Sequence, residues 1–250
     1  MVEIHVSAKN YRLAIEALEK MDRLSPELSR AFQRVLYFRA AELFNNLELE
    51  DAIPLFQRAI RMNKTPEITA SARYWLGETF YQLKSYPDAI GQWESFLSSP
   101  SASSLEEYAH VYYHLGYARL KLKDYAGALT EFRTYLTQNN SPKDAKANDA
   151  LLRSADCFFV LKRFEQALEA YSASANHPDF GTDYAYFQLG MLQGLTGDQA
   201  GKEQTMGRLA ENFPTSPLNE EALYEKGLAA VRQDKPNQAL TTFDQLRMRF

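Results

Sequence analysis

Residues 70–97 read ASARYWLGETFYQLKSYPDAIGQWESFL, and this stretch predicts one helix, a tight turn and a second helix. Apolar residues recur at helical spacing on both sides of a Lys-Ser turn at 84–85. Gly77 and Ala89 are small where their neighbours are large, which allows two helix backbones to approach closely, and Trp93 fills the space beside them. One such hairpin cannot bury its apolar faces alone, so we expect it to stack on copies of itself.

The same pattern returns along the whole chain. The small residue of each second helix falls at Ala14, Ala52, Ala89, Ala128 and Ala167, then at the less regular Lys202, then at Ala239. The steps between these positions are 38, 37, 39, 39, 35 and 37 residues. A nearly constant period of this length is typical of a helical solenoid. Because a lysine replaces the small residue at position 202, we expect the unit that contains it to be distorted.

The period sets the expected bounds of the repeats. A lone second helix is expected at 9–22, followed by hairpins at about 26–62, 66–98, 104–138, 142–175, 182–212 and 217–249. First helices are expected at 26–46, 66–83, 104–122, 142–161, 182–195 and 217–232, and the remaining second helices at 49–62, 86–98, 125–138, 164–175, 199–212 and 236–249. A hydroxyl residue before Pro26, Pro66 and Pro142 marks three helix starts. Residues 1–250 are thus expected to form a single solenoid, cut from a longer chain.

Composition and charge exclude several classes of protein. The net charge of -4 and the absence of a basic stripe argue against binding to nucleic acid or to an anionic membrane surface. No apolar run approaches the roughly 20 residues that span a bilayer, so we expect no direct membrane insertion of this segment. The single cysteine, Cys157, excludes an intrachain disulfide and a multi-thiolate zinc site, and its apolar surroundings predict a buried structural thiol.

One group of residues has the spacing of metal ligands. His110 and His114 lie four residues apart on a predicted first helix, and Glu106 precedes them by a further turn. The glutamate beside the first histidine of a zincin motif is missing, which favours surface or packing histidines instead. We therefore expect no metal, no cofactor and no catalytic residue in this chain.

The repeat resembles a known family at several positions. Leu-Gly pairs at 76–77, 115–116 and 189–190, with turn-proximal aromatics at Tyr86 and Tyr125, resemble the tetratricopeptide repeat (TPR) family over nearly the whole chain. The resemblance implies an all-α, right-handed α-α superhelical solenoid that binds other proteins without catalysis. The long period and the run at 208–227 resemble a subclass of bacterial cell-envelope proteins, of the type of the TolA-binding coordinator and the outer-membrane assembly lipoprotein. That subclass implies the periplasm or cell envelope, with the cytoplasm as the alternative.

In this family the first helices line a concave face, and the resemblance assigns a row of aromatic and charged residues to it. The expected partner-binding residues are Tyr37, Phe44, Tyr74, Glu78, Tyr81, Tyr113, Tyr117, Lys121, Asp156, Phe159, Phe187, Tyr224 and Arg232. Tyrosine and phenylalanine give a large contact area at small entropic cost, as interface anchors commonly do. For each aromatic residue the alternative is that it packs on the neighbouring first helix.

Two hypotheses about function follow. The first is a noncatalytic interaction scaffold whose concave aromatic groove holds a peptide or a helix of a partner protein, within a bacterial envelope assembly. The second is the regulatory or substrate-recruiting region of a larger enzyme, or a module that self-associates through exposed repeat ends.

Overall fold

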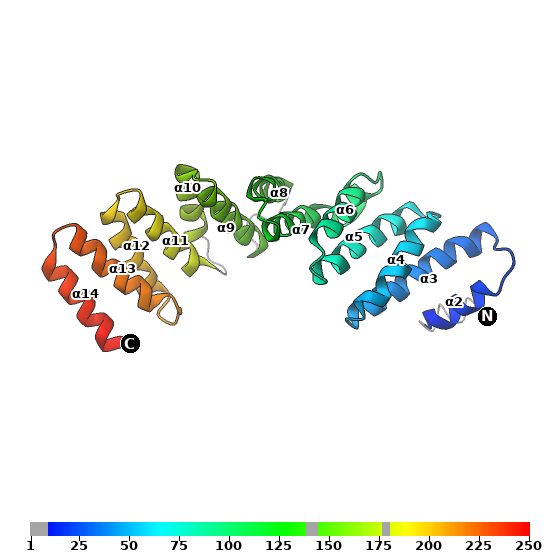
Figure 1. Cartoon of the computed structure of the whole chain (residues 1–250), viewed down its shortest axis with the longest axis horizontal. Helices are drawn as coiled ribbons and strands as arrows, with labels where there is room; N and C mark the ends of the chain where they lie inside the picture. The colour runs from blue at the N-terminus through cyan, green and yellow to red at the C-terminus, as the bar shows by residue number, and fades with distance from the viewer. Residues whose placement is uncertain (1–9, 139–144, 177–180) are drawn as a thin grey trace. The chain divides into compact units, whose positions relative to one another are not determined.

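A computed structural model of the chain describes residues 10–138, 145–176 and 181–250 (Figure 1). Within these ranges every regular element is helical and no residue lies in a strand, so the all-α prediction is confirmed. The chain divides into two compact units, unit 1 at residues 1–124 and unit 2 at residues 125–250. Each unit is a stack of helical hairpins, and the expectation of one continuous array over 1–250 stays a prediction.

Unit 1 contains the first hairpins. Its elements are α2 (Tyr11–Glu19), α3 (Pro26–Asn45), α4 (Leu49–Met62), α5 (Pro66–Gln82), α6 (Tyr86–Leu97), the 3-10 turn η1 (Ala102–Ser104) and α7 (Glu107–Lys121). Successive helices pack on each other, and the first helices α3, α5 and α7 are also neighbours in space. The predicted start at 104 is three residues early, because Ala102–Ser104 forms η1 before α7 begins at Glu107.

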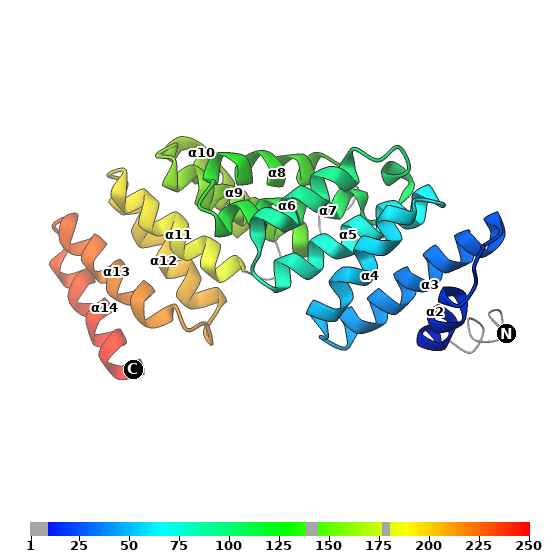
Figure 2. The same cartoon turned by 45° about the vertical axis from the view of Figure 1, so that its right-hand side comes forward.

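Unit 2 repeats this arrangement. Its helices are α8 (Tyr125–Gln138), α9 (Ala145–Val160), α10 (Phe164–Ala175), α11 (Thr182–Leu195), α12 (Gln199–Asn212), α13 (Asn219–Arg232) and α14 (Pro236–Arg249). Figure 2 shows α11 beside α12 and α13 beside α14, and these pairs pack closely. The remaining predicted helix bounds agree with the structure to within three residues. The expected helix start at Pro142 lies outside the described residues.

The turn inside each hairpin has one recurring geometry. A residue in the left-handed conformation follows each first helix, at Leu47, Lys84, Lys123, Lys162, Gly197 and Asp234. The next backbone N–H then donates to a carbonyl five residues earlier, as Ser85 does to Phe80 at 2.8 Å. This hydrogen bond is the signature of a Schellman cap, which ends a helix and reverses the chain. The left-handed positions are 37, 39, 39, 35 and 37 residues apart, so the period read from the sequence is the period of these caps.

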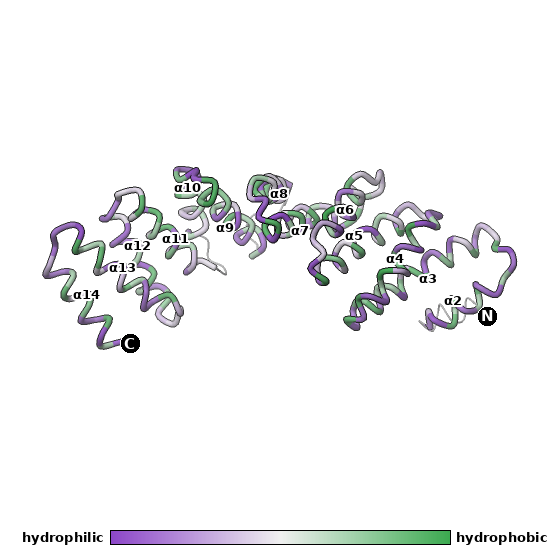
Figure 3. The backbone as a smooth tube through the Cα atoms, viewed as in Figure 1, coloured by the Kyte–Doolittle hydropathy of each residue, from purple (hydrophilic) through white to green (hydrophobic). Residues whose placement is uncertain are grey.

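The close approach of the two helices in a hairpin depends on the small residue after leucine. A Cβ on Gly77 would meet the Trp93 indole at 2.4 Å, and one on Gly227 would meet the Phe243 ring at the same distance. Trp93 is fully buried, as is Cys157, so the predicted structural thiol is confirmed. Figure 3 shows hydrophobic and hydrophilic residues alternating along the helices, as expected where one side of each helix packs in the stack.

The hairpin of α11 and α12 accommodates the large Lys202 on its second helix because its first helix has a small residue, Gly194, at the facing position. Lys202 is only 3% exposed, and its aliphatic chain lies where a Cβ on Gly194 would meet it at 2.6 Å. In the hairpin of α5 and α6 the residue equivalent to Gly194 is the large Tyr81, and the residue equivalent to Lys202 is the small Ala89. The Lys202 ammonium pairs with the carboxylate of Glu225 on α13. The expected distortion is therefore absent, since Gly194 provides the space and Glu225 neutralises the buried charge.

Candidate functional site

Tyr74 lies between the core of unit 1 and the surface formed by its first helices α3, α5 and α7, which we call the first-helix face. Its side chain on α5 is only 7% exposed, and its ring lies 5.4 Å from Trp75 and 5.7 Å from Phe96. Its backbone carbonyl accepts a hydrogen bond from the indole N–H of Trp93 at 3.2 Å. The hydroxyl reaches His114 on α7, with 3.4 Å between the hydroxyl oxygen and Nε2. Tyr74 is therefore held from several sides, and its hydroxyl is the part that faces α7.

Glu78 lies one turn after Tyr74 and faces the same histidine. Its Oε1 is 2.9 Å from Nδ1 of His114, and the two side chains are 14% and 24% exposed. This contact has ion-pair distance but not the alignment of a hydrogen bond, so the buried Oε1 has no well-directed donor among the described residues. The imidazole balances the carboxylate charge only when it is protonated.

A second carboxylate, Glu107, acts on the same tyrosines from the start of α7. The pKa of Tyr37 is raised to about 12, mainly by burial and then by the charge of Glu107, against hydrogen bonds to Trp75 and Ser71 that lower it. Burial is also the main cause that raises the pKa of Tyr74, followed by the charges of Glu78 and Glu107. The helices α3, α5 and α7 thus place Tyr37, Tyr74, Glu78, Glu107 and His114 together, and we call these residues the Glu78 site.

The other predicted residues of unit 1 differ in exposure. Tyr81 is half-buried, with its ring 5.5 Å from Tyr86 and 5.9 Å from Trp93. Tyr113 and Tyr117 form an edge-to-face pair at 5.0 Å, and both are half-buried. The remaining two are Phe44, which is 9% exposed with its ring 5.3 Å from Trp75, and Lys121, which is exposed. The three tyrosines are thus partly exposed, whereas Phe44 and Tyr74 mainly fill the core.

Asp156 of unit 2 has a complete set of internal partners. Its Oδ1 accepts hydrogen bonds from the hydroxyls of Tyr171 at 2.7 Å and Tyr184 at 3.2 Å. Its Oδ2 accepts one from Arg153 Nη1 at 2.5 Å, and the Arg153 guanidinium lies over the ring of Tyr184 at 5.5 Å. The pKa of Tyr184 is raised to about 12, mainly by burial and then by the charge of Asp156. We call these four residues the Asp156 cluster.

The other predicted residues of unit 2 are scattered in environment. Phe187 is 8% exposed and belongs to a buried cluster with Met206 and Leu209. Phe159 and Tyr224 are exposed large hydrophobic residues, and Arg232 is also exposed. The row predicted by resemblance therefore contains both core and surface residues, and its role in partner binding stays a prediction.

Sequence reasoning missed the residues that complete the Glu78 site. The sequence singles out His114 only as a candidate metal ligand with His110 and Glu106, and it does not single out Glu107. Glu107 and His114 are seven residues apart and therefore lie on the same face of α7, which is the face toward α5. This spacing is the sequence signal that could have identified them. No group of His, Cys, Asp or Glu in the described ranges could hold a metal ion.

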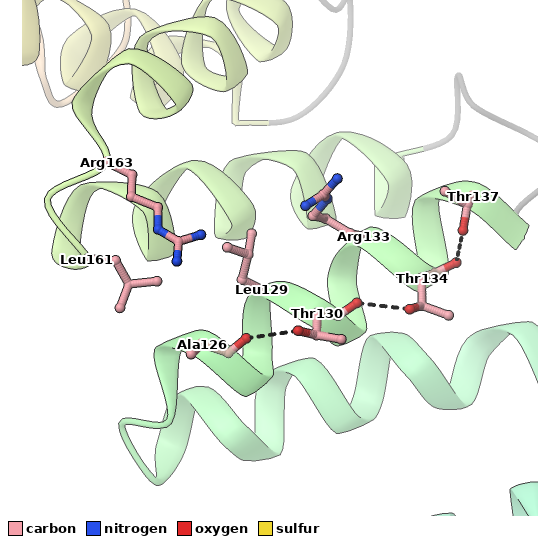
Figure 4. A pocket seen from close by; sticks show the side chains of 8 residues that line it. All are labelled: Ala126, Leu129, Thr130, Arg133, Thr134, Thr137, Leu161 and Arg163. Atoms are coloured by element: carbon pink, nitrogen blue, oxygen red, sulfur yellow. Dashed lines mark hydrogen bonds between the residues drawn. The ribbon is translucent and has the colours of Figure 1, made fainter.

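A shallow groove lies on α8 of unit 2, away from the residues named above. It encloses about 440 Å³ and is lined by one face of α8 and by the turn before α10 (Figure 4). The hydroxyls of Thr130, Thr134 and Thr137 donate to carbonyls of their own helix. Arg133 and Arg163 are exposed and make no ion pair with described residues, and Figure 4 shows them on opposite sides of Leu129. Its hydroxyl donors are already used, so the groove offers only two surface guanidinium groups.

Comparison with known families identifies the repeat. Two models, both described as tetratricopeptide repeat, match the chain, one at residues 39–95 and 113–179 and the other at residues 184–216 and 221–249. Together these ranges span more than half of the sequence. The chain therefore belongs to the tetratricopeptide repeat family, whose modules typically bind proteins and peptides without catalysis.

Solved structures of the same fold agree with this assignment. The C-terminal part of a TPR protein from Cytophaga hutchinsonii has a TM-score of 0.66 at 16% identity, covering 85% of this chain and 78% of that one. YrrB, solved as a TPR protein with an unusual peptide-binding site, has a TM-score of 0.59 at 19% identity, covering 78% and 91%. PilW, a type IV pilus biogenesis factor, has a TM-score of 0.56 at 16% identity, covering 86% and 92%.

Two further findings bear on the class of protein. A sequence search of curated proteins found no match to this chain. Within the described ranges, no helix is both long enough and apolar enough to cross a bilayer.

Proposed function

We propose that this chain is a noncatalytic scaffold that binds a peptide or helix of a partner protein on its first-helix face. The observation that supports the proposal is the pair of half-buried tyrosines Tyr113 and Tyr117 on α7, together with half-buried Tyr81 on the neighbouring helix α5. Tyrosine side chains that are anchored by packing and still partly exposed provide contact area with little loss of side-chain entropy. A stack of rigid hairpins presents them at fixed spacing, so little ordering is needed at binding.

The proposal is tested by selecting binders from a random dodecapeptide phage library against the 250-residue protein. We expect Tyr113→Ala combined with Tyr117→Ala to weaken the selected peptides at least about 30-fold, as hot-spot truncation does. The far-UV circular dichroism should be retained. Tyr11→Ala is the matched control, because Tyr11 is a half-buried tyrosine on the second helix α2. Equal affinity of both variants for every selected peptide would contradict a first-helix binding face.

We also propose that the scaffold works in a bacterial envelope assembly. The support is the long period of 35 to 39 residues between repeats, which resembles the envelope subclass of the family. Cell fractionation of a bacterium that carries the intact gene tests the location. Recovery with periplasmic or envelope markers is expected, and recovery in the cytosolic fraction alone would contradict the proposal.

A further inference from the structure

We propose that the Glu78 site binds an arginine side chain of the partner segment. The inference rests on the proposed function, because it names the chemistry of the ligand that the first-helix face of unit 1 recognises. It concerns the site formed by α3, α5 and α7, where the carboxylates of Glu78 and Glu107 would bind the positively charged guanidinium.

The first support is the charge balance of the site. Two carboxylates lie on neighbouring helices, and no arginine or lysine among the described residues pairs with either of them. The ion-paired arginines of unit 1 are directed elsewhere: Arg30 pairs with Glu27, Arg39 with Glu42, Arg58 with Glu19, and Arg119 with Glu94 and Asp124. The face therefore offers negative charge that only His114 partly offsets.

The second support is the state of the buried carboxylate oxygen. Oε1 of Glu78 is shielded from solvent, yet no donor in the described part of the unit is aligned with it. A buried acceptor without a directed donor carries an energetic cost, and a donor from a ligand would remove that cost. A guanidinium has five N–H donors in a rigid fork, so it can approach Glu78 and still have donors left for Glu107.

The third support is the presence of aromatic side chains in the Glu78 site. The charge of Glu107 acts on Tyr37 and Tyr74, and that of Glu78 acts on Tyr74. The ring centroids of Tyr74 and Trp75 are 5.4 Å apart, with an interplanar angle of 89°. A planar guanidinium stacks on aromatic faces more readily than an ammonium does, because it is more weakly hydrated. Aromatic rings next to carboxylates thus favour arginine over lysine.

The fourth support is an internal example of the same arrangement. Asp156 occupies the position in its repeat that Glu78 occupies in unit 1, directly after the small residue of the first helix. There the chain supplies its own guanidinium, since Arg153 donates to Asp156 and lies over the Tyr184 ring. In unit 1 the position of Arg153 is taken by Trp75 and that of Tyr184 by His110, so the carboxylate is present there without the arginine. A partner's arginine would supply the missing group.

The test uses the same random dodecapeptide selection against the 250-residue protein. Failure of the arginine assignment can then be told apart from failure of the proposed function. We expect arginine to be enriched in the selected peptides. Replacing the key arginine of a selected peptide by citrulline, its neutral analogue, should weaken binding at least 10-fold, and lysine should restore only part of the loss. Trp75 and Trp93, the only two tryptophans, both lie in unit 1, so their fluorescence reports binding there directly.

The protein variants complete the test. Glu78→Gln with Glu107→Gln should weaken the arginine peptide at least 10-fold and leave the citrulline peptide unchanged. Glu16→Gln with Glu50→Gln is the charge-matched control, because both residues are exposed on second helices of unit 1. Three results would each overturn the arginine assignment: no enrichment of arginine in the selected peptides, full affinity of the citrulline peptide, or equal effects of the two double variants. If no selected peptide depends on Tyr113 and Tyr117, the proposed function itself fails.

Discussion

Glu78 of unit 1 and Asp156 of unit 2 stand at the same place in their repeats but have different surroundings. Asp156 accepts hydrogen bonds from Arg153, Tyr171 and Tyr184. Among the described residues Glu78 forms its only ion pair with His114, without the alignment of a hydrogen bond. A carboxylate that is fully satisfied inside the fold stabilises the stack, whereas one that is not satisfied is available to a ligand. Position in the repeat therefore does not define the role of a residue, and its neighbours on adjacent helices do.

The largest expected difference between the two sites is in stability. Asp156→Ala should lower the free energy of unfolding by about 2 to 3 kcal/mol, because it removes the acceptor of two tyrosine hydroxyls and one of the two carboxylates that pair with the partly buried Arg153 guanidinium. Glu78→Ala should cost less than about 1 kcal/mol, because it removes one poorly aligned contact. Urea unfolding followed by circular dichroism measures both values. Equal losses would show that the two carboxylates have the same structural role.

The two sites also differ in the small residue that precedes each carboxylate. Gly77→Ala should destabilise unit 1 by about 1 to 3 kcal/mol, because the new Cβ would meet the buried Trp93 at 2.4 Å and overpack the hairpin. Ala155→Gly should cost only about 1 kcal/mol, mainly through the lower helix propensity of glycine. Thermal unfolding of both variants compares them. A neutral Gly77→Ala would mean that the Trp93 ring can move aside.

A smaller difference is expected for the tyrosine hydroxyls. Tyr171→Phe removes a 2.7 Å hydrogen bond to a carboxylate and should cost about 1.5 to 2 kcal/mol. Tyr74→Phe removes a 3.4 Å contact with His114 and should cost less than about 0.5 kcal/mol. A double-mutant cycle of Tyr171→Phe with Asp156→Asn isolates the coupling between that pair. A coupling energy near zero would separate Tyr171 from the Asp156 cluster.

The smallest expected effect is a loss of stability at alkaline pH. Tyr37 in unit 1 and Tyr184 in unit 2 contribute to it through their raised pKa values. The pKa values of Tyr37 and Tyr184 are raised to about 12 by burial and by nearby carboxylates. The stability from keeping these phenols neutral is complete below the ordinary tyrosine pKa of about 10 and is lost as pH rises from there toward 12. Glu107→Gln should lower the pKa of Tyr37, and Asp156→Asn should lower that of Tyr184. Phenolate absorbance near 295 nm, with Tyr37→Phe and Tyr184→Phe as references, measures each shift. An unchanged titration in either variant would remove that carboxylate as a cause.

Helix positions were predictable because their signals are local. The turns at Lys84 and Lys162 follow the last apolar residues of first helices, and proline marks the starts at Pro26 and Pro66. Periodicity then gave the hairpins, since each repeat reports its own amphipathic face. The expectation of a distortion around Lys202 was wrong because it came from a single position. Gly194 lies eight residues earlier and already carries the compensating change in size.

The binding face was predictable only as a set of candidates. Resemblance placed Tyr74 and Tyr113 in one row, but exposure depends on residues of other helices, and Tyr74 proved to be almost buried against Phe96 and His114. The partners of Asp156 come from α9, α10 and α11, a combination that no single repeat contains. Contacts between repeats are therefore the part that periodicity cannot supply.

The buried pair of Lys202 and Glu225 has a consequence for how such an array can evolve. Repeat proteins commonly grow by duplicating or exchanging hairpins, which requires that neighbouring copies be interchangeable. Here Gly194, Lys202 and Glu225 depend on one another across two successive hairpins. Exchange of the α13–α14 hairpin alone would leave the buried Lys202 ammonium without its carboxylate, and exchange of the α11–α12 hairpin alone would leave Glu225 without its ammonium. The buried ion pair is therefore kept only when the two hairpins are exchanged together and in their present order.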